Sequence, residues 1–374
     1  MKKRVFCLVL LLAVPLSGCS LLDRNTLSVE PHAEQYVEES SVLRAGNYQE
    51  LVNAILYLVS EASEEGKIRL YDYQGDVDAD VAAACLEVTR DDPLGAYAVD
   101  YMTSEYDRIM SYYEVSVKIS YRRDAQQIRA VKNATGSSAI REEIQTVLLK
   151  FGPELALRIT YFTEDESYIQ ALVKSAYYDS PQAAFGMPEV TVSLYPDSGT
   201  QRVVEIRLTY PLDADVLEKM KEQTAAEAWE MVSRLSPMTD EKKVGDLYDI
   251  LIAATEYDTG TEKASAQPGF VKNNAYNAYG ALVEGKALSE GYALAFRLLC
   301  SAAGIDCQVV QGTVKGAEHF WNIVELDGRY YHVDTAMGDL QGSEWFLMRS
   351  DDEMENSYKW DREQYPACVS SPVE

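Results

Sequence analysis

The sequence predicts an α+β protein in which a duplicated α/β region precedes a separate C-terminal domain. Three observations support this fold class. The 374 residues are 47% hydrophobic, which is enough material for two or three domains with their own cores. Strand-like and helical segments recur at a nearly constant spacing in the first two thirds. The last third instead contains a long helical pattern followed by a strong hairpin signal.

The first residues have the layout of an export signal. Lys2, Lys3 and Arg4 precede a short apolar run, and Leu16-Ser17-Gly18-Cys19 resembles a bacterial lipobox. We therefore expect residues 1–18 to be a lipoprotein signal peptide and Cys19 to become a lipid-modified N-terminus. Two acyl chains on one cysteine suffice for stable anchoring. The alternative is an ordinary cleaved signal in which the cysteine is incidental.

The charge of the chain excludes one class of partner. The formal net charge is −26, and removal of residues 1–18, which hold three basic and no acidic residues, makes it −29. Such a chain is repelled by the phosphate backbone, so we expect no nucleic acid partner.

The expected location is extracytoplasmic, with the lipid on Cys19 anchoring the protein to the bacterial cell membrane. The expected ligand is a cell-envelope protein or peptide.

The remaining cysteines are too few for a disulfide scaffold. Beyond the signal and Cys19 there are Cys85, Cys300, Cys307 and Cys368, whose spacings match no zinc pattern. We expect mostly buried thiols, with one disulfide possible and its pairing open, and no cofactor.

Three pairs of similar segments indicate an internal duplication. Their offsets are 89, 88 and 89 residues, which favours a repeated unit over chance composition. The pairs are KIRLYDY (67–73) with ALRITYF (156–162), DDPLGAYAV (91–99) with DSPQAAFGM (179–187), and the strand-like segments that end at Asp124 and Asp213.

The predicted organisation follows from these repeats. After a tether over 19–40, the duplicated region spans 41–236, with units at about 60–125 and 150–214. The units contain no His and a single cysteine, Cys85, so we interpret them as two copies of a spacer or binding module. The C-terminal domain spans 237–374 and is expected to begin with a helix capped by Thr239 or Asp240.

A helix is predicted to follow Ser289. Tyr292, Ala295, Phe296 and Leu299 form a buried stripe at helical spacing, and Gly304 is placed to end the helix. Ser289 lies at the N-terminal end of the same stripe, beside the positive end of the helix dipole. By pattern alone, a plain N-cap is the favoured interpretation of Ser289, because serine is common in that role.

The next segment predicts a hairpin that brings a His and an Asp together. Asp327-Gly328 is a two-residue turn signal, so Leu326 faces Arg329 and, counting back, Trp321 faces Asp334. His319 then lies on the same sheet face as Trp321, diagonal to Asp334 and within reach of it. A base and the carboxylate that orients it need this geometry.

These motifs resemble the transglutaminase-like superfamily, which is related to papain-type cysteine proteases. The family pattern is a Cys followed by Glu-Gly-Tyr-Ala, then His-Ala-Trp-Asn, then an Asp fifteen residues after the His. This chain has Ser289 followed by EGYA, then HFWN from His319, then Asp334. The resemblance covers about 237–370 and implies a papain-like fold with a Ser289, His319, Asp334 site.

Two departures from the family bear on chemistry. The nucleophilic Cys is replaced by Ser289, and Ala336-Met337 stands where the family has Thr-Trp, so an aromatic wall is expected to be missing. We therefore expect a catalytically inactive binding or scaffolding module. The alternatives are an active peptide-amide hydrolase or acyltransferase using Ser289, His319 and Asp334, and a function that lies in the duplicated region.

One further arrangement of the site histidines stays open. His332 shares a face with Asp334, so His319, Asp334 and His332 together offer three metal-ligating groups. Because no further ligand is evident, we favour an interpretation in which His332 packs beside the site and no metal is bound.

Overall fold

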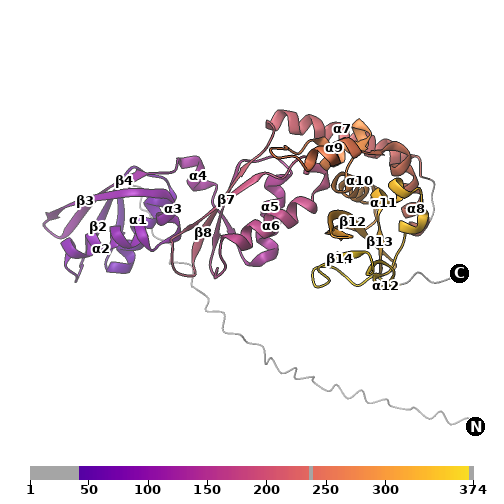
Figure 1. The fold of residues 1–374 in the computed structure, drawn as a ribbon. Coiled ribbons are helices and arrows are strands. Elements are labelled where there is room, and N and C mark those ends of the chain that lie inside the picture. Colours follow the sequence, from indigo (N-terminus) through magenta and orange to yellow (C-terminus); the bar gives the residue numbers. More distant parts are fainter. Residues whose placement is uncertain (1–41, 236–238, 370–374) are drawn as a thin grey trace, which may run out of the picture.

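A computed structural model describes residues 42–235 and 239–369 and shows mixed helices and sheets. The predicted signal peptide, the tether and Cys19 lie outside the described residues. In Figure 1 the first α/β unit, the second α/β unit and the C-terminal domain follow one another along an extended molecule. Among the helices that the structure describes, none is long and apolar enough to cross a membrane.

The first unit is a four-stranded sheet with two long helices on one face. The strand order is β1-β2-β4-β3, with β1 parallel to β2 and the other pairs antiparallel. Its elements are β1 (Val42–Ala45), α1 (Tyr48–Ser60), β2 (Glu65–Tyr71), α2 (Val77–Arg90), α3 (Pro93–Ala98), β3 (Val99–Ile109) and β4 (Tyr112–Tyr121).

The second unit has the same topology. Its strand order is β5-β6-β8-β7, again with one parallel pair followed by two antiparallel pairs. The helix α4 (Ala125–Arg129) leads into β5 (Lys132–Ala134), α5 (Gly136–Leu148), β6 (Glu154–Ile159), α6 (Glu166–Tyr178), η1 (Pro181–Ala183), β7 (Glu189–Tyr195) and β8 (Arg202–Thr209). The shared order includes β1 and β5, which precede the predicted ranges 60–125 and 150–214.

The two sheets differ in what covers their second face. In the second unit, Ala156 and Val203 are buried against the core of the first unit, and Arg123 reaches across to Glu205 at 2.8 Å. The residues 89 positions earlier are Lys67 and Glu114, which form a 2.6 Å ion pair on the corresponding face of the first unit. Equivalent positions therefore hold apolar side chains in the second unit, where the first unit covers the sheet face, and charged side chains on the corresponding face of the first unit.

The C-terminal domain packs a central helix against an antiparallel sheet of order β13-β12-β11-β14. Its elements are α7 (Ala214–Ser233), α8 (Asp240–Ala254), β9 (Glu256–Tyr257), α9 (Thr259–Ser265), η2 (Asn274–Tyr276), η3 (Gly280–Glu284), β10 (Lys286–Ala287), α10 (Ser289–Ala302), β11 (Cys307–Val314), β12 (Ala317–Leu326), β13 (Arg329–Val333), α11 (Thr335–Gln341), η4 (Glu344–Phe346), α12 (Asp351–Met354) and β14 (Tyr358–Trp360).

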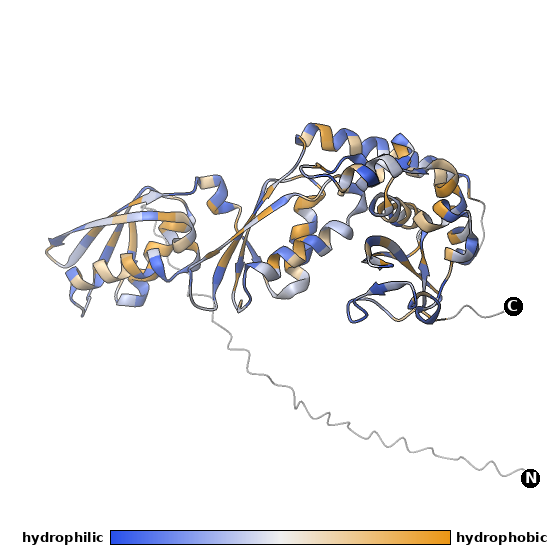
Figure 2. Ribbon diagram, viewed as in Figure 1, coloured by the Kyte–Doolittle hydropathy of each residue, from blue (hydrophilic) through white to orange (hydrophobic). Residues whose placement is uncertain are grey.

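The helix α10 is the centre of this domain. Tyr292, Ala295, Phe296 and Leu299, the predicted stripe, are all fully buried, and Figure 2 shows apolar residues along α10 and the strands beside it. Gly304 follows the helix with φ of +77°, a conformation that favours glycine and ends the helix as predicted. The second unit and this domain share one continuous hydrophobic core, so α10 is packed from both sides.

The hairpin of β12 and β13 has the predicted register. Leu326 pairs with Arg329, and both turn residues, Asp327 and Gly328, have positive φ, as a two-residue turn of this kind requires. The ladder ends at Asn322 and Val333. The strand β12 therefore continues beyond its partner toward Phe320 and His319, and this unpaired edge lies at the start of α10.

Candidate functional site

His319 and Asp334 are in direct contact, as the hairpin register predicts. Nε2 of His319 lies 2.7 Å from Oδ2 of Asp334, although the residues are fifteen positions apart. The side chain of Asp334 is fully buried, and that of His319 is 8% exposed. Because Nε2 is taken by the carboxylate, Nδ1 is the ring nitrogen left to exchange a proton with a reacting group.

Asp334 is held by two further donors. The hydroxyl of Tyr358 donates to Oδ2 at 2.7 Å, and the backbone N–H of Met337 donates to Oδ1 at 3.0 Å, because Asp334 is also the N-cap of α11. Burial, and then the neighbouring Asp334, raise the pKa of Tyr358. Tyr358 therefore stays protonated and donates to the carboxylate. Nothing in the sequence pattern points to Tyr358, because β14 joins the sheet only through long-range packing.

Aromatic side chains flank the His319 ring. Trp321 lies nearly parallel to it at 6.2 Å between ring centroids, and Tyr358 meets it edge-on at 6.1 Å. Met337, in the position where the family has Trp, packs against the same cluster. Met337 contributes no aromatic surface at this position, whereas Trp321 of β12 and Tyr358 of β14 place aromatic rings beside His319.

Ser289 is the first residue of α10, and the N-cap is Leu288, which makes no side-chain capping bond. The plain N-cap interpretation of Ser289 is therefore wrong. Ser289 is 8% exposed, and its Oγ accepts a 3.4 Å hydrogen bond from the backbone N–H of Phe320. This N–H lies on β12 beyond the end of its ladder with β13. The hydroxyl thus satisfies a buried donor that lacks a strand partner.

The hydrogen bonds of the described residues include none between Ser289 and His319. The Ser289 hydroxyl meets the backbone N–H of Phe320, the residue that follows His319, so the structure brings the two residues close together without joining their side chains. His319 and Asp334, the base and the carboxylate that orients it, are hydrogen-bonded to each other, whereas the hydroxyl of Ser289 is hydrogen-bonded to the backbone.

The residue after Ser289 carries a buried carboxylate that the second unit helps to hold. Glu290 is 5% exposed and accepts hydrogen bonds from Tyr178 at 2.9 Å and from Nζ of Lys272 at 2.7 Å. Tyr178, at the end of α6, also packs its ring against Phe320 at 5.6 Å. Burial, and then Glu290, raise the pKa of Tyr178, so its hydroxyl remains a donor. The duplicated region thus contributes a side chain beside the site, which the sequence did not indicate.

His332 does not join His319 and Asp334, contrary to the metal alternative. Its Nδ1 accepts from Nε1 of Trp321 at 3.0 Å, and its Nε2 lies 2.9 Å from Oδ1 of Asp351. The indole N–H can only donate, so Nδ1 has no proton and Nε2 carries it toward Asp351. Burial lowers the pKa of His332, in agreement with a neutral ring.

The same hydrogen bonds argue against a metal at His332. Asp351 and Cys368 place ligand atoms within 4.8 Å of the imidazole. A metal at Nε2 would displace the only ring proton while Trp321 still donates to Nδ1, whereas metal-bound histidines donate their second ring N–H to a neighbour. Burial and Asp351 also raise the pKa of the Cys368 thiol, which opposes the thiolate that binds metals. We interpret this cluster as a hydrogen-bonded support of Trp321.

The thiols within residues 42–235 and 239–369 offer no substitute nucleophile. Cys85, Cys300, Cys307 and Cys368 are buried, and none of these four forms a disulfide. Cys300 lies on α10 about 16 Å along the axis from Ser289, and burial raises its pKa well above the ordinary value.

Residues 230–335 match the family model of the transglutaminase-like superfamily. Among solved structures, the chain is similar to one described as a TGase, at 14% identity over 57% of this chain and 56% of that chain, with a TM-score of 0.31. It is also similar to a candidate cysteine protease from Cytophaga hutchinsonii (14% identity, 40% and 62% of the two chains, TM-score 0.24). A third similar structure is the periplasmic domain of TgpA from Pseudomonas aeruginosa (14% identity, 42% and 64%, TM-score 0.24).

In each case the match spans less than two thirds of the other chain. No curated protein sequence matches the chain. The matched residues of the family model contain α10, the β12–β13 hairpin and the His319–Asp334 pair. The chain therefore carries, as its C-terminal domain, a member of the transglutaminase-like superfamily.

Proposed function

We propose that the protein is a membrane-anchored extracytoplasmic lipoprotein whose transglutaminase-like domain is catalytically inactive and serves as a binding or scaffolding module at the cell envelope. The observation that carries this proposal is the state of Ser289. Its Oγ stands at the position of the family's nucleophile but accepts a hydrogen bond from the Phe320 N–H. A hydroxyl in this position has a structural role that does not depend on catalysis.

The energetics of deprotonation support inactivity. A free thiol of pKa about 8.5 reaches its thiolate at pH 7 for about 2 kcal/mol, which a helix N-terminus and a histidine can supply. If the pKa of water, about 15.7, stands in for a hydroxyl, the same step costs roughly 12 kcal/mol. A serine must therefore lose its proton during attack, to a base that is hydrogen-bonded to it. His319 makes no such bond to Ser289 among the described contacts.

The second candidate function is a peptide-amide hydrolase or acyltransferase with Ser289 as nucleophile, His319 as base and Asp334 as its orienter. One observation favours it: the His319–Asp334 contact of 2.7 Å is intact and is reinforced by Tyr358. Catalytic hydrogen bonds are often long before substrate binds, so this candidate would require the Ser289–His319 bond to form in the substrate complex.

A covalent probe separates the two functions. The folded protein is treated with a fluorophosphonate serine probe and analysed by peptide mass spectrometry, and hydrolysis of a peptide-amide library is measured for the wild type and Ser289→Ala. We expect no label on Ser289 and no turnover that depends on it. Labelling of Ser289 together with amide turnover that disappears in Ser289→Ala would establish the hydrolase instead.

The proposed location rests on the N-terminal sequence. The basic start, the short apolar run and Leu16-Ser17-Gly18-Cys19 occur together, as in bacterial lipoproteins. A lipid on Cys19 would anchor the chain, and the negative charge of the mature protein would keep it away from anionic lipid surfaces.

A further inference from the structure

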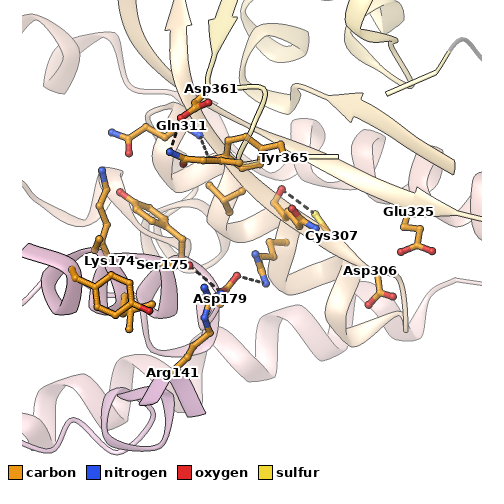
Figure 3. Close-up of a pocket in the computed structure, with 18 residues that line it drawn as sticks. Arg141, Lys174, Ser175, Asp179, Asp306, Cys307, Gln311, Glu325, Asp361 and Tyr365 are labelled. Carbon is orange, nitrogen blue, oxygen red and sulfur yellow. Dashed lines mark hydrogen bonds and ion pairs between the residues drawn. The ribbon is translucent and has the colours of Figure 1, made fainter. Parts of the chain in front are cut away.

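A cleft of about 1020 Å³ lies between the second unit and the transglutaminase-like domain. One wall is α6, with Lys174, Ser175 and Asp179, and the other is β11 with the loop that follows β14. Figure 3 shows these side chains facing one another across the cleft. Tyr178, which hydrogen-bonds to Glu290, also lines it, so the cleft reaches the surroundings of Ser289 without including Ser289 itself.

The strand β11 presents a largely unpaired edge to this cleft. The ladder between β11 and β14 covers only Gly312–Val314 of the described strand. The N–H of Gln311 points to this edge, where the hydroxyl of Tyr365 accepts it at 3.2 Å. Backbone direction alternates along a strand, so the peptide groups of Val309 and Cys307 point to the same edge, and both residues line the cleft.

An unpaired edge within a cleft selects for an extended polypeptide. A strand laid beside β11 would form backbone hydrogen bonds with Cys307 and Val309, because Tyr365 already accepts the N–H of Gln311, and its alternate side chains would face the walls. The cleft walls carry tyrosines and glutamines, including Tyr168, Gln308 and Tyr365, which suit the side chains of such a strand. Neither a lipid nor a nucleic acid backbone offers the matching row of N–H and C=O groups.

The charges in the cleft specify the peptide further. Arg141 and Arg297 both pair with Asp179, at 3.3 and 3.0 Å, so two guanidinium groups share one carboxylate. Lys174 lies exposed one turn earlier on α6 and adds a third cation. On this side of the cleft three cations accompany the single carboxylate of Asp179, a local excess of positive charge, although the whole lining holds four carboxylates and three cations. The other three carboxylates, those of Asp306, Glu325 and Asp361, lie on the side of the transglutaminase-like domain.

We propose that this cleft binds an extended peptide segment of another protein by strand addition to β11, with an acidic side chain of the peptide directed to Arg297, Arg141 and Lys174. The proposal specifies the ligand of the binding role proposed above and rests on it. Strand addition at β11 requires no chemistry at Ser289, so loss of peptide binding by the cleft variants and labelling of Ser289 are separate outcomes that distinguish failure of one proposal from failure of the other.

The test uses a phage-displayed library of random peptides selected on the full-length chain. We expect enriched peptides to carry an acidic residue and to lack proline in their centre. For one selected peptide, fluorescence polarisation gives the dissociation constant for the wild type, for Lys174→Glu and Arg297→Gln, and for Lys219→Glu, an exposed lysine outside the cleft. Each cleft variant should weaken binding about tenfold, and Lys219→Glu should leave binding unchanged.

Two further measurements test the strand-addition mode. N-methylation of alternate backbone amides in the peptide should abolish binding for one set of positions only, and the Val309 amide should exchange more slowly in the complex. The proposal is overturned if selection yields no binder, if the cleft variants bind as tightly as wild type, or if both N-methylated sets bind normally.

Discussion

The backbone N–H of Phe320 donates a 3.4 Å hydrogen bond to Oγ of Ser289, just beyond the point where β12 loses its partner β13. This relationship predicts that Ser289→Ala destabilises the fold. A buried N–H left without an acceptor costs about 1–3 kcal/mol, which urea unfolding will measure. Ser301→Ala, an exposed position on the same helix, is the control and should change stability by less than about 0.5 kcal/mol. Equal effects of the two substitutions would contradict a structural role for the Ser289 hydroxyl.

A cysteine at position 289 should recover a reactive nucleophile. The helix N-terminus and the nearby His319 both stabilise a thiolate, so Ser289→Cys should be alkylated by iodoacetamide at neutral pH faster than a free cysteine. Addition of His319→Ala should slow the reaction, and peptide mass spectrometry will separate this thiol from the buried ones. A rate no higher than that of free cysteine, with or without His319, would mean that the site no longer holds a catalytic geometry.

Tyr358→Phe removes one of the three donors to Asp334. A hydrogen bond to a charged group contributes about 1.5–3 kcal/mol, so we expect a loss of this size in the free energy of unfolding. Tyr106→Phe is the matched control, since Tyr106 is 41% exposed and lies on a strand of the first unit. The same variant in the Ser289→Cys background should also slow alkylation if Asp334 orients His319; a stability loss with an unchanged rate would confine Tyr358 to a structural role.

The neutral His332 ring predicts a stability that depends on pH. Burial lowers the pKa of His332 below the ordinary value of 6.5, so the unfolded chain binds the proton more readily than the folded one. The contribution of His332 to the free energy of unfolding should therefore be fully present above about pH 6.5 and decrease as the pH falls below that value. His332→Gln keeps one donor for Asp351 and one acceptor for Trp321, and it should flatten the thermal unfolding profile between pH 7 and pH 5. An unchanged profile would show that His332 is not the group that titrates.

The N-terminal prediction concerns a residue outside the described part of the chain. Cys19→Ala should abolish lipid-dependent processing and membrane retention, because it removes the site of acylation. Membrane fractionation and the gel mobility of the product will check this. A variant that stays in the membrane fraction with unchanged mobility would show that the lipobox interpretation of Leu16-Ser17-Gly18-Cys19 is wrong.

Features set by local pattern could be predicted from the sequence. The turn at Asp327-Gly328 fixes the hairpin register, and that register alone brings His319 to Asp334. The stripe on α10 and its stop at Gly304 follow from helical spacing and from the left-handed conformation that glycine permits. These features depend on residues that lie close together in the sequence, so the spacing of apolar residues and the conformational preferences of turn residues are enough to predict them.

Features set by packing between distant elements could not be predicted. Tyr358 reaches Asp334 because β14 pairs with β11, and Tyr178 reaches Glu290 because the C-terminal end of α6 meets α10, where Asp179 also pairs with Arg297; neither tyrosine carries a sequence signal of its role. The hydrogen bond that Ser289 accepts could not be predicted for the same reason, since it depends on where the β12–β13 ladder ends. The start of each α/β unit was missed because β1 and β5 are short strands whose sequences do not resemble each other.

The arrangement of the hydrophobic cores determines which part of the molecule would separate first under a pulling force. The second unit and the transglutaminase-like domain share one core, whereas the first unit has its own, to which the second unit contributes the buried residues Ala156 and Val203. The two units also meet through the Arg123–Glu205 and Asp92–Arg158 ion pairs and through the ring contact of Tyr97 with Tyr195. We expect a pull along the chain to open these contacts between the units before it strains the core that the second unit shares with the transglutaminase-like domain. The molecule would then lengthen at the junction of the two units, and the cleft and the surroundings of Ser289 would stay folded.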